Sequence, residues 1–153
     1  MEKEKFMLVD GNSLLFRAFH ALPLLHTREG IFTNGVYGFL TMFNRVVAQE
    51  KPDFVLVAFD KSRKTFRSDT YEDYKANRSE PPEELRGQFD LVRQALSALG
   101  VRWMEVEGFE ADDIIGTLSK QAESQGIKSV IVTGDGDALQ LVGLNTQVLM
   151  TRK

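Results

Sequence analysis

The chain has 153 residues, of which 42% are hydrophobic and 27% are charged, a composition typical of one compact domain with its own core. It has no cysteine and a formal net charge of −3, which excludes disulfides, thiolate metal sites and a generally basic surface for nucleic acid. It contains neither a run of about 20 apolar residues nor the apolar core of a signal peptide, so we expect a cytoplasmic protein without membrane contact.

The N-terminal part of the chain predicts two buried strands joined by helices. Residues 6–9 form a short apolar run that ends in Asp10, followed by a loop that would present this carboxylate. Apolar residues spaced by three and four positions predict a helix over 35–49, with Asn34 placed to cap it. A second apolar run, 54–59, again ends in an aspartate.

Residues 61–80 lack an apolar period and predict a basic arch or loop. Within 61–78, six basic residues face three acidic ones, a local net charge of +3 in an otherwise acidic chain. These basic residues are Lys61, Arg63, Lys64, Arg67, Lys75 and Arg78.

The second half of the chain continues the alternation of helices and strands. Pro81 and Pro82 open a helical pattern, and another begins near Glu110. The predicted strands are 129–133, a weaker one at 146–150, and another around 101–106. This alternation predicts a three-layer α/β/α fold with a mostly parallel central sheet, whose ligands bind outside the carboxyl ends of the strands.

Seven acidic residues form a candidate metal site, because they follow predicted strands or begin a predicted helix at one edge of the sheet. Crowded carboxylates raise one another's pKa unless a cation lies between them, and Mg²⁺ prefers oxygen ligands. His20 and His26 are the only histidines, which argues against zinc. Each acid alone is as well explained as a turn residue or helix cap, and only their conjunction favours a metal. They are Asp10, Asp60, Glu110, Asp112, Asp113, Asp135 and Asp137.

Five sequence runs, from about residue 6 to about residue 150, resemble the 5′-nuclease domain found at the N-terminus of bacterial DNA polymerase I, a branch of the flap-endonuclease family. They are VDGNSLLFRAFHALP (9–23), VAFD (57–60), FRSDTYEDYKANR (66–78), EGFEADDIIGTL (107–118) and VTGDGDALQLV (132–142). The resemblance implies a PIN-like, resolvase-like fold. It also implies a structure-dependent 5′-3′ exonuclease and 5′-flap endonuclease that hydrolyses DNA by a two-metal mechanism in replication and repair.

The resemblance further implies Mg²⁺ as the cofactor, with Mn²⁺ able to substitute, and DNA with 5′ ends or flaps as the partner. The expected protein is bacterial, cytoplasmic and monomeric. In the full-length protein, a DNA polymerase can be fused to this domain. Matched by motif, the seven acids become the metal ligands, and Lys75 and Arg78 become the catalytic pair at the scissile phosphate. The residues expected to contact DNA are Arg17, Lys61, Arg63, Lys64, Arg67 and Tyr74.

The sequence departs from the family pattern at a few points. Phe16 stands where the family usually has tyrosine, and Gly136 replaces a usually basic residue. The chain stops at Lys153, before the helix–hairpin–helix region of the family. We therefore expect a single domain over 1–153 that folds and binds Mg²⁺ or Mn²⁺ weakly, with feeble nuclease activity.

Three alternatives remain open from the sequence. A PIN-like ribonuclease would share the acidic sheet edge, but the basic segment at 61–80 argues against it. A non-catalytic module that binds DNA or metal is opposed by the intact acids. A phosphatase would need a nucleophilic aspartate in another loop pattern, which VDGN at 9–12 matches only in part.

Overall fold

A computed structural model describes residues 4–60, 83–134 and 146–150 of the chain. Its centre is a five-stranded sheet with the order β3-β2-β1-β4-β5, and all four strand pairings are parallel. The strands are β1 (Lys5–Asp10), β2 (Phe54–Ala58), β3 (Arg102–Met104), β4 (Lys128–Thr133) and β5 (Thr146–Met150). The predicted parallel sheet is therefore confirmed, including its weaker strands.

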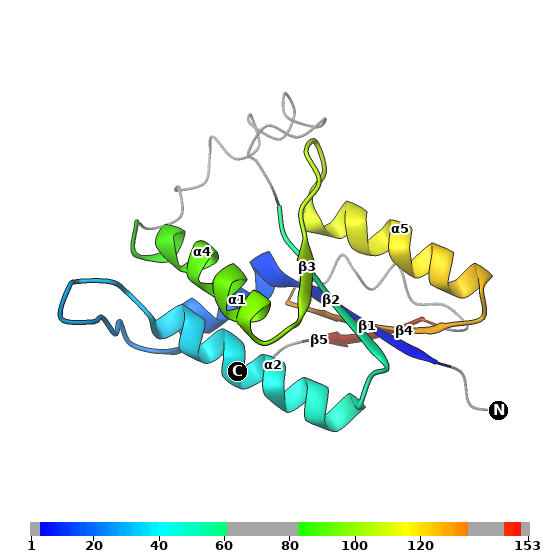
Figure 1. Ribbon diagram of the computed structural model, residues 1–153, viewed down its shortest axis with the longest axis horizontal. Helices are drawn as coiled ribbons and strands as arrows, with labels where there is room; N and C mark the ends of the chain where they lie inside the picture. Colours follow the sequence, from blue (N-terminus) through cyan, green and yellow to red (C-terminus); the bar gives the residue numbers. More distant parts are fainter. Residues whose placement is uncertain (1–3, 61–82, 135–145, 151–153) are drawn as a thin grey trace.

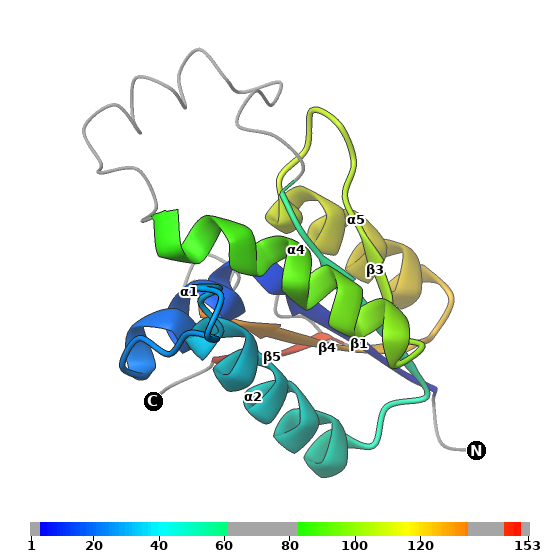
Figure 2. The ribbon, with the colours of Figure 1, turned by 60° about the vertical axis from the view of Figure 1, so that its left-hand side comes forward.

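In the described part of the chain, four helices cover the two faces of this sheet (Figures 1 and 2). They are α1 (Gly11–Ala21), α2 (Asn34–Glu50), α4 (Glu83–Ala98) and α5 (Ala111–Ser124). Helices α1, α2 and α4 pack on one face, whereas α5 packs on the other. The three-layer α/β/α architecture predicted from the sequence is thus the one observed.

The central strands β1 and β4 are buried on both faces, which explains why they read as continuous apolar runs. In β1, Met7 and Val9 belong to the core under α1, α2 and α4, whereas Leu8 belongs to the core under α5. In β4, Val130 and Ile131 divide between the two cores in the same way. Two separate apolar cores therefore hold the sheet between its helices.

The order of the strands fixes where a ligand can bind. From β1 the chain proceeds outward to β2 and β3, then returns to place β4 and β5 on the other side of β1. The order in which the strands are added to the sheet therefore reverses between β1 and β4, although these two strands run parallel. Val9 of β1 is in register with Val132 of β4. In open parallel sheets, the carboxyl ends of the two strands at such a reversal flank a crevice used for binding. Asp10 ends β1 at this point.

Asp10 is followed directly by a helix rather than by the predicted loop. Helix α1 begins at Gly11, and the Asp10 side chain caps it by accepting a hydrogen bond from the backbone N–H of Ser13. Gly11 is required here because a Cβ at this position would lie 2.7 Å from Cζ of the buried Phe59 ring. The direct connection of β1 to α1 therefore requires glycine, which has no Cβ, at position 11.

Asn34 does not cap α2, in contrast to the sequence-based prediction. The capping position belongs to Thr33, whose side chain makes no capping hydrogen bond. Asn34 is instead fully buried and donates to the carbonyl oxygen of Phe19 at 2.9 Å, while it accepts from Gln88 of α4 at 3.1 Å. Oε1 of Gln88 also accepts from the backbone N–H of Val36 at 3.0 Å. Another helix therefore supplies the cap that α2 lacks locally.

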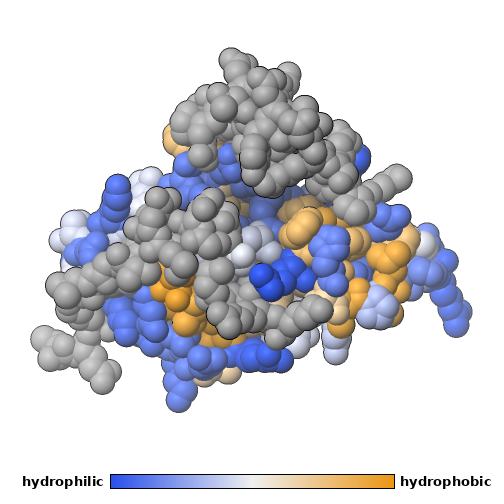
Figure 3. Space-filling model, turned by 180° about the vertical axis from the view of Figure 1, so that it is seen from behind, coloured by the Kyte–Doolittle hydropathy of each residue, from blue (hydrophilic) through white to orange (hydrophobic). Residues whose placement is uncertain are grey.

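Several large apolar side chains remain exposed on α1, on α2 and on the loop between these helices. They are Phe16, Leu24, Leu25, Ile31 and Tyr37. In Figure 3, hydrophobic residues are seen beside hydrophilic ones over the end of the molecule that carries this loop. Within the described ranges, no helix is both long and apolar enough to cross a membrane.

We expect Gln88→Leu to destabilise the protein by about 2 kcal/mol or more, since it leaves buried polar groups of Asn34 and Val36 without partners. Urea denaturation followed by circular dichroism measures this free energy of unfolding. Gln94→Leu, on an exposed position of the same helix, is the matched control and should change stability by less than about 0.5 kcal/mol. Equal losses in the two variants would contradict the capping role of Gln88.

Candidate metal centre

The carboxylate of Asp10 lies at the centre of the candidate site, and only 4% of this residue is exposed. One of its oxygens accepts the backbone N–H of Ser13 at 3.1 Å, and the other accepts the hydroxyl of Thr133 at 3.3 Å. Thr133 ends β4, so the second contact joins the ends of β1 and β4, the two strands between which the strand order reverses. Both oxygens are therefore held in place by groups of the protein itself.

Ser13 completes a small hydrogen-bonded network at the same place. Its hydroxyl lies 3.2 Å from Oγ1 of Thr133 and accepts the backbone N–H of Gly134 at 3.0 Å. The network fixes the position of Gly134, the residue that follows β4. Ser13 and Thr133 are not among the site residues predicted from the sequence. The available signal was a hydroxyl three residues after Asp10, which is the spacing of a helix cap, and a hydroxyl directly before the GDGD loop.

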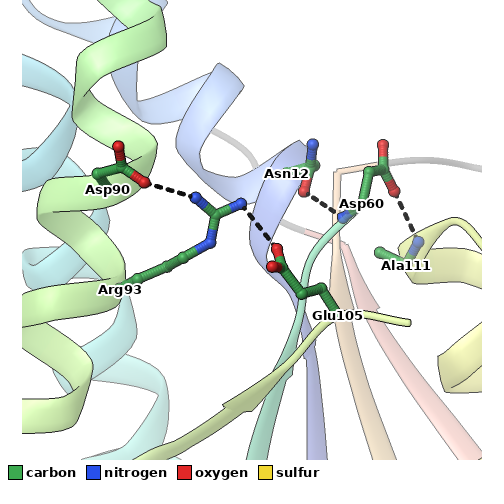
Figure 4. A network of polar contacts seen from close by, with 6 residues as sticks. All are labelled: Asn12, Asp60, Asp90, Arg93, Glu105 and Ala111. Carbon is green, nitrogen blue, oxygen red and sulfur yellow. Dashed lines mark hydrogen bonds and ion pairs between the residues drawn. The ribbon is translucent and has the colours of Figure 1, made fainter. Parts of the chain in front are cut away.

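Asp60 lies close enough to Asp10 for its charge to raise the pKa of that group. It also links three elements (Figure 4). Its backbone N–H donates to Oδ1 of Asn12 in α1 at 2.9 Å. Its own Oδ1 accepts the backbone N–H of Ala111, the first residue of α5, at 2.6 Å. The aspartate after β2 is therefore fixed by contacts with one helix on each face of the sheet.

The pKa of Asp10 shows that further negative charge surrounds it. Burial, followed by the negative charge of Asp112, raises this pKa from 3.8 to about 7, and the charge of Asp60 adds to the effect. The hydrogen bond from Ser13 acts in the opposite direction but does not cancel them. Asp10, Asp60 and Asp112 thus lie near one another at the carboxyl edge of the sheet, although Asp112 itself is exposed to solvent.

Glu110 and Asp113 have a defined role at the start of α5. The Glu110 side chain accepts the backbone N–H of Asp113, and the Asp113 side chain accepts the backbone N–H of Glu110 at 3.0 Å. This reciprocal pair is a capping box, which satisfies two amides that the helix cannot pair itself. Both acids therefore act as helix caps, whereas their role as metal ligands stays a prediction.

Many of the predicted site residues lie outside the described residues. They are Asp135 and Asp137 among the acids, and Lys61, Arg63, Lys64, Arg67, Tyr74, Lys75 and Arg78 in the basic segment. Among the residues that are described, no group of three or more acidic or histidine side chains is arranged so that it could hold a metal ion. That search does not extend to Asp135 and Asp137.

Helix α1, which begins at the site, carries two further residues considered in the sequence. Arg17 is half-buried on this helix, and its contact with DNA stays a prediction. The ring of His20 packs edge-on against Phe16 and Phe19, with centroids 4.5 and 5.1 Å away. These contacts give His20 a packing role on α1.

The donor chemistry of the site fits a divalent cation. Burial, followed by the charges of Asp112 and Asp60, raises the pKa of Asp10 although two hydrogen bonds hold its carboxylate, so a bound cation would favour its charged form. Oxygen donors without thiolate or imidazole suit a hard ion such as Mg²⁺ or Mn²⁺. Asp10, Asp60 and Asp112 are the described residues that can supply these oxygens.

Residues 5–153 match the family model described as the 5′-3′ exonuclease, N-terminal resolvase-like domain. The chain is 52% identical over 153 residues to DNA polymerase I of Mycobacterium leprae, and 47% identical over 152 residues to DNA polymerase I of Bacillus subtilis. Each alignment covers 99% of this chain, which spans only 17% of the length of either relative.

Solved structures of bacteriophage T5 proteins share the fold. The T5 D15 protein co-crystallised with metal ions gives a TM-score of 0.71 at 21% identity, over 96% of this chain and 55% of that one. The T5 D15 flap endonuclease in a pseudo-enzyme-product complex with DNA and metal ions gives a TM-score of 0.68 at 18% identity, with the same coverage. At these identities the likeness concerns the fold alone.

The raised pKa of Asp10 predicts that the metal-free protein loses stability as the pH rises. The folded state keeps the Asp10 proton up to about pH 7, whereas an ordinary aspartate releases it near 3.8. The folded state therefore binds more protons within this window, and the free energy of unfolding falls across it. Asp10→Asn should remove this slope and be more stable than the wild type at pH 8 by about 2 kcal/mol.

Urea denaturation in the presence of a chelator, at pH 5, 6.5 and 8, tests this prediction. Glu29→Gln, a change at an exposed carboxyl on the loop between α1 and α2, serves as the control and should keep the wild-type slope. A wild type whose stability does not fall between pH 5 and 8 would contradict the raised pKa.

Proposed function

The chain belongs to the 5′-3′ exonuclease family, as its N-terminal resolvase-like domain, and on this premise we propose that it forms the metal-binding part of a 5′-nuclease. The reaction is hydrolysis of DNA phosphodiester bonds at 5′ ends and 5′ flaps. The observation that carries this proposal is the meeting of Asp10, Asp60 and Asp112 at the edge of the sheet where the strand order reverses. An acidic sheet edge at this place suits a cation that in turn binds phosphate.

The proposed cofactor is Mg²⁺, with Mn²⁺ as a substitute, in a site for two ions. Asp10, Asp60 and Asp112 would hold them, with Glu110, Asp113, Asp135 and Asp137 as the ligands proposed from the sequence. When bound, such ions lower the pKa of water and offset the charge that develops on the phosphate. The chain's own contribution is to hold Asp10 by the hydrogen bonds from Ser13 and Thr133, so that its carboxylate is oriented before an ion arrives.

The basic segment supplies the proposed contacts with DNA. In a chain with a net charge of −3, its six basic residues concentrate positive charge on one short stretch, which suits a phosphate backbone. Lys75 and Arg78 are proposed to contact the scissile phosphate. Tyr74 can stack on an unpaired base, and Arg17 can reach a phosphate from α1.

The relatives support the wider biological role that we propose. The curated relatives are named DNA polymerase I, and one T5 neighbour of the same fold is described as a flap endonuclease in complex with DNA and metal ions. We therefore propose that the chain acts in bacterial DNA replication and repair, as a cytoplasmic monomer associated with polymerase activity in the same protein.

The proposal is tested with labelled 5′-flap DNA, duplex DNA and single-stranded RNA, each with Mg²⁺, with Mn²⁺ and with a chelator. We expect cleavage of flap DNA that needs a metal ion, together with binding of Mn²⁺ measured by electron paramagnetic resonance. Asp10→Asn should weaken Mn²⁺ binding by about tenfold or more and reduce cleavage in parallel. Glu29→Gln is the matched control and should leave both quantities unchanged.

Cleavage of RNA alone would favour the ribonuclease alternative over the 5′-nuclease. Mn²⁺ binding without cleavage of any substrate would favour a non-catalytic metal-binding module. Cleavage that persists in the chelator, or in Asp10→Asn, would overturn the proposed metal centre.

Lys75→Ala and Arg78→Ala should separate catalysis from metal binding. Because these side chains are proposed to offset charge on the phosphate, each variant should lower the cleavage rate by about 100-fold while the affinity for Mn²⁺ stays that of the wild type. Single-turnover cleavage and Mn²⁺ titration measure the two effects. A parallel loss of Mn²⁺ affinity would show that these residues act on the metal site instead.

A further inference from the structure

Arg93 of α4 contacts several residues that adjoin the candidate metal centre. Its guanidinium carbon lies 4.9 Å from the centroid of the Phe59 ring and 5.7 Å from that of Trp103. The same group forms ion pairs with Asp90 at 3.1 Å and with Glu105 at 3.2 Å. Only 18% of the Arg93 side chain is exposed. Figure 4 shows it reaching from α4 to Glu105, directly after β3.

Through Phe59, Arg93 contacts the residue that directly precedes one acid of the candidate metal centre, Asp60. Phe59 is fully buried and immediately precedes Asp60. Its ring lies against Gly11, which immediately follows Asp10, so closely that a Cβ there would collide with it. Arg93 therefore contacts a ring that lies against Gly11, the residue after Asp10, and that belongs to the residue before Asp60.

The ion pair with Glu105 connects Arg93 to the segment that precedes the third acid, Asp112. Glu105 begins the segment that joins β3 to α5 and passes through Gly108, whose φ of 84° requires a glycine. At the end of this segment the capping box of Glu110 sets the start of α5, and Ala111 donates to Asp60. Asp112 follows in the first turn of the helix. The ion pair thus holds the other end of the segment that presents Asp112.

The stability of the fold does not explain a charged group at this position. Removing an arginine from water is costly, and ion pairs in such places are often no more stabilising than an apolar side chain of equal size. Here Asp90 is 78% exposed, which weakens its pair. Nε of Arg93 is moreover buried without a hydrogen-bond partner in the described part of the chain. The planar fork does, however, pair with Glu105, directly after β3, while it lies over the Phe59 ring, directly after β2.

We propose that Arg93 is a positioning residue of the candidate metal centre. By stacking on Phe59 and pairing with Glu105, it holds the end of β2, which carries Asp60, at a fixed separation from the segment that carries Asp112. The inference rests on the proposed function, because it gives these acids a shared ion to bind. Arg93 itself touches neither metal nor substrate.

The test compares Arg93→Met, Arg93→Lys and Glu105→Gln with the wild-type chain. The first readout is the affinity for Mn²⁺, measured by electron paramagnetic resonance. The second, taken without metal, is the chemical shift and hydrogen exchange of the Ala111 amide, which donates to Asp60. Leu96→Ala, a buried change in the same helix, is the control for lost stability alone.

We expect Arg93→Met to weaken Mn²⁺ binding by about tenfold, to shift the Ala111 amide and to accelerate its exchange. Glu105→Gln should act in the same direction and add little to Arg93→Met in the double variant. Arg93→Lys, which keeps the charge, should recover part of the affinity. Leu96→Ala should lower the melting temperature and leave both readouts unchanged.

Reduced stability of Arg93→Met with wild-type Mn²⁺ affinity and an unchanged Ala111 amide would overturn the inference. Failure of the wild type to bind Mn²⁺ would instead refute the proposed metal centre, and the Ala111 amide would then decide whether Arg93 positions Asp60. Should Arg93→Met not fold, Arg93→Lys and Glu105→Gln give the same two readouts.

Discussion

The structure depends above all on the burial of one carboxylate between two parallel strands. Asp10 ends β1 beside the end of β4, where solvent reaches only 4% of its surface. A charge in such a place is unfavourable unless the surrounding groups compensate it. The hydrogen bonds from Ser13 and Thr133 do so only in part, because Asp60 and Asp112 add negative charge. The burial of this carboxylate therefore lowers the stability of the protein when the group is charged.

The hydrogen bonds at this edge serve the fold and the site at once. Asp10 caps α1, Asp60 accepts the first amide of α5, and the Glu110–Asp113 pair caps the same helix. In each case a helix N-terminus, which offers unpaired amides and a positive dipole end, meets an acidic side chain. A helix cap and a metal ligand are thus compatible roles for one carboxylate, since it has two oxygens to share.

The sequence predicted those features that repeat along the chain. Buried strands and amphipathic helices leave periodic patterns, so the sheet, its layers and the acidic edge could be derived from local runs such as 6–9 and 129–133. Contacts between distant polar groups leave no such pattern. The partnership of Asn34 with Gln88 spans 54 positions, and it replaced the local cap that the sequence indicated. Thr133 and Arg93 escaped prediction for the same reason, because their partners are chosen by the packed fold.

The close contact between Gly11 and Phe59 also constrains how this sequence can change over time. The two positions are 48 residues apart, yet the ring occupies the space that any side chain at position 11 would need. A larger residue at position 11 is therefore accessible only after the ring at position 59 has been replaced by something smaller. The reverse order passes through a protein with a collision beside Asp10. Substitutions at the two sites should accordingly be ordered and correlated among descendants of this chain.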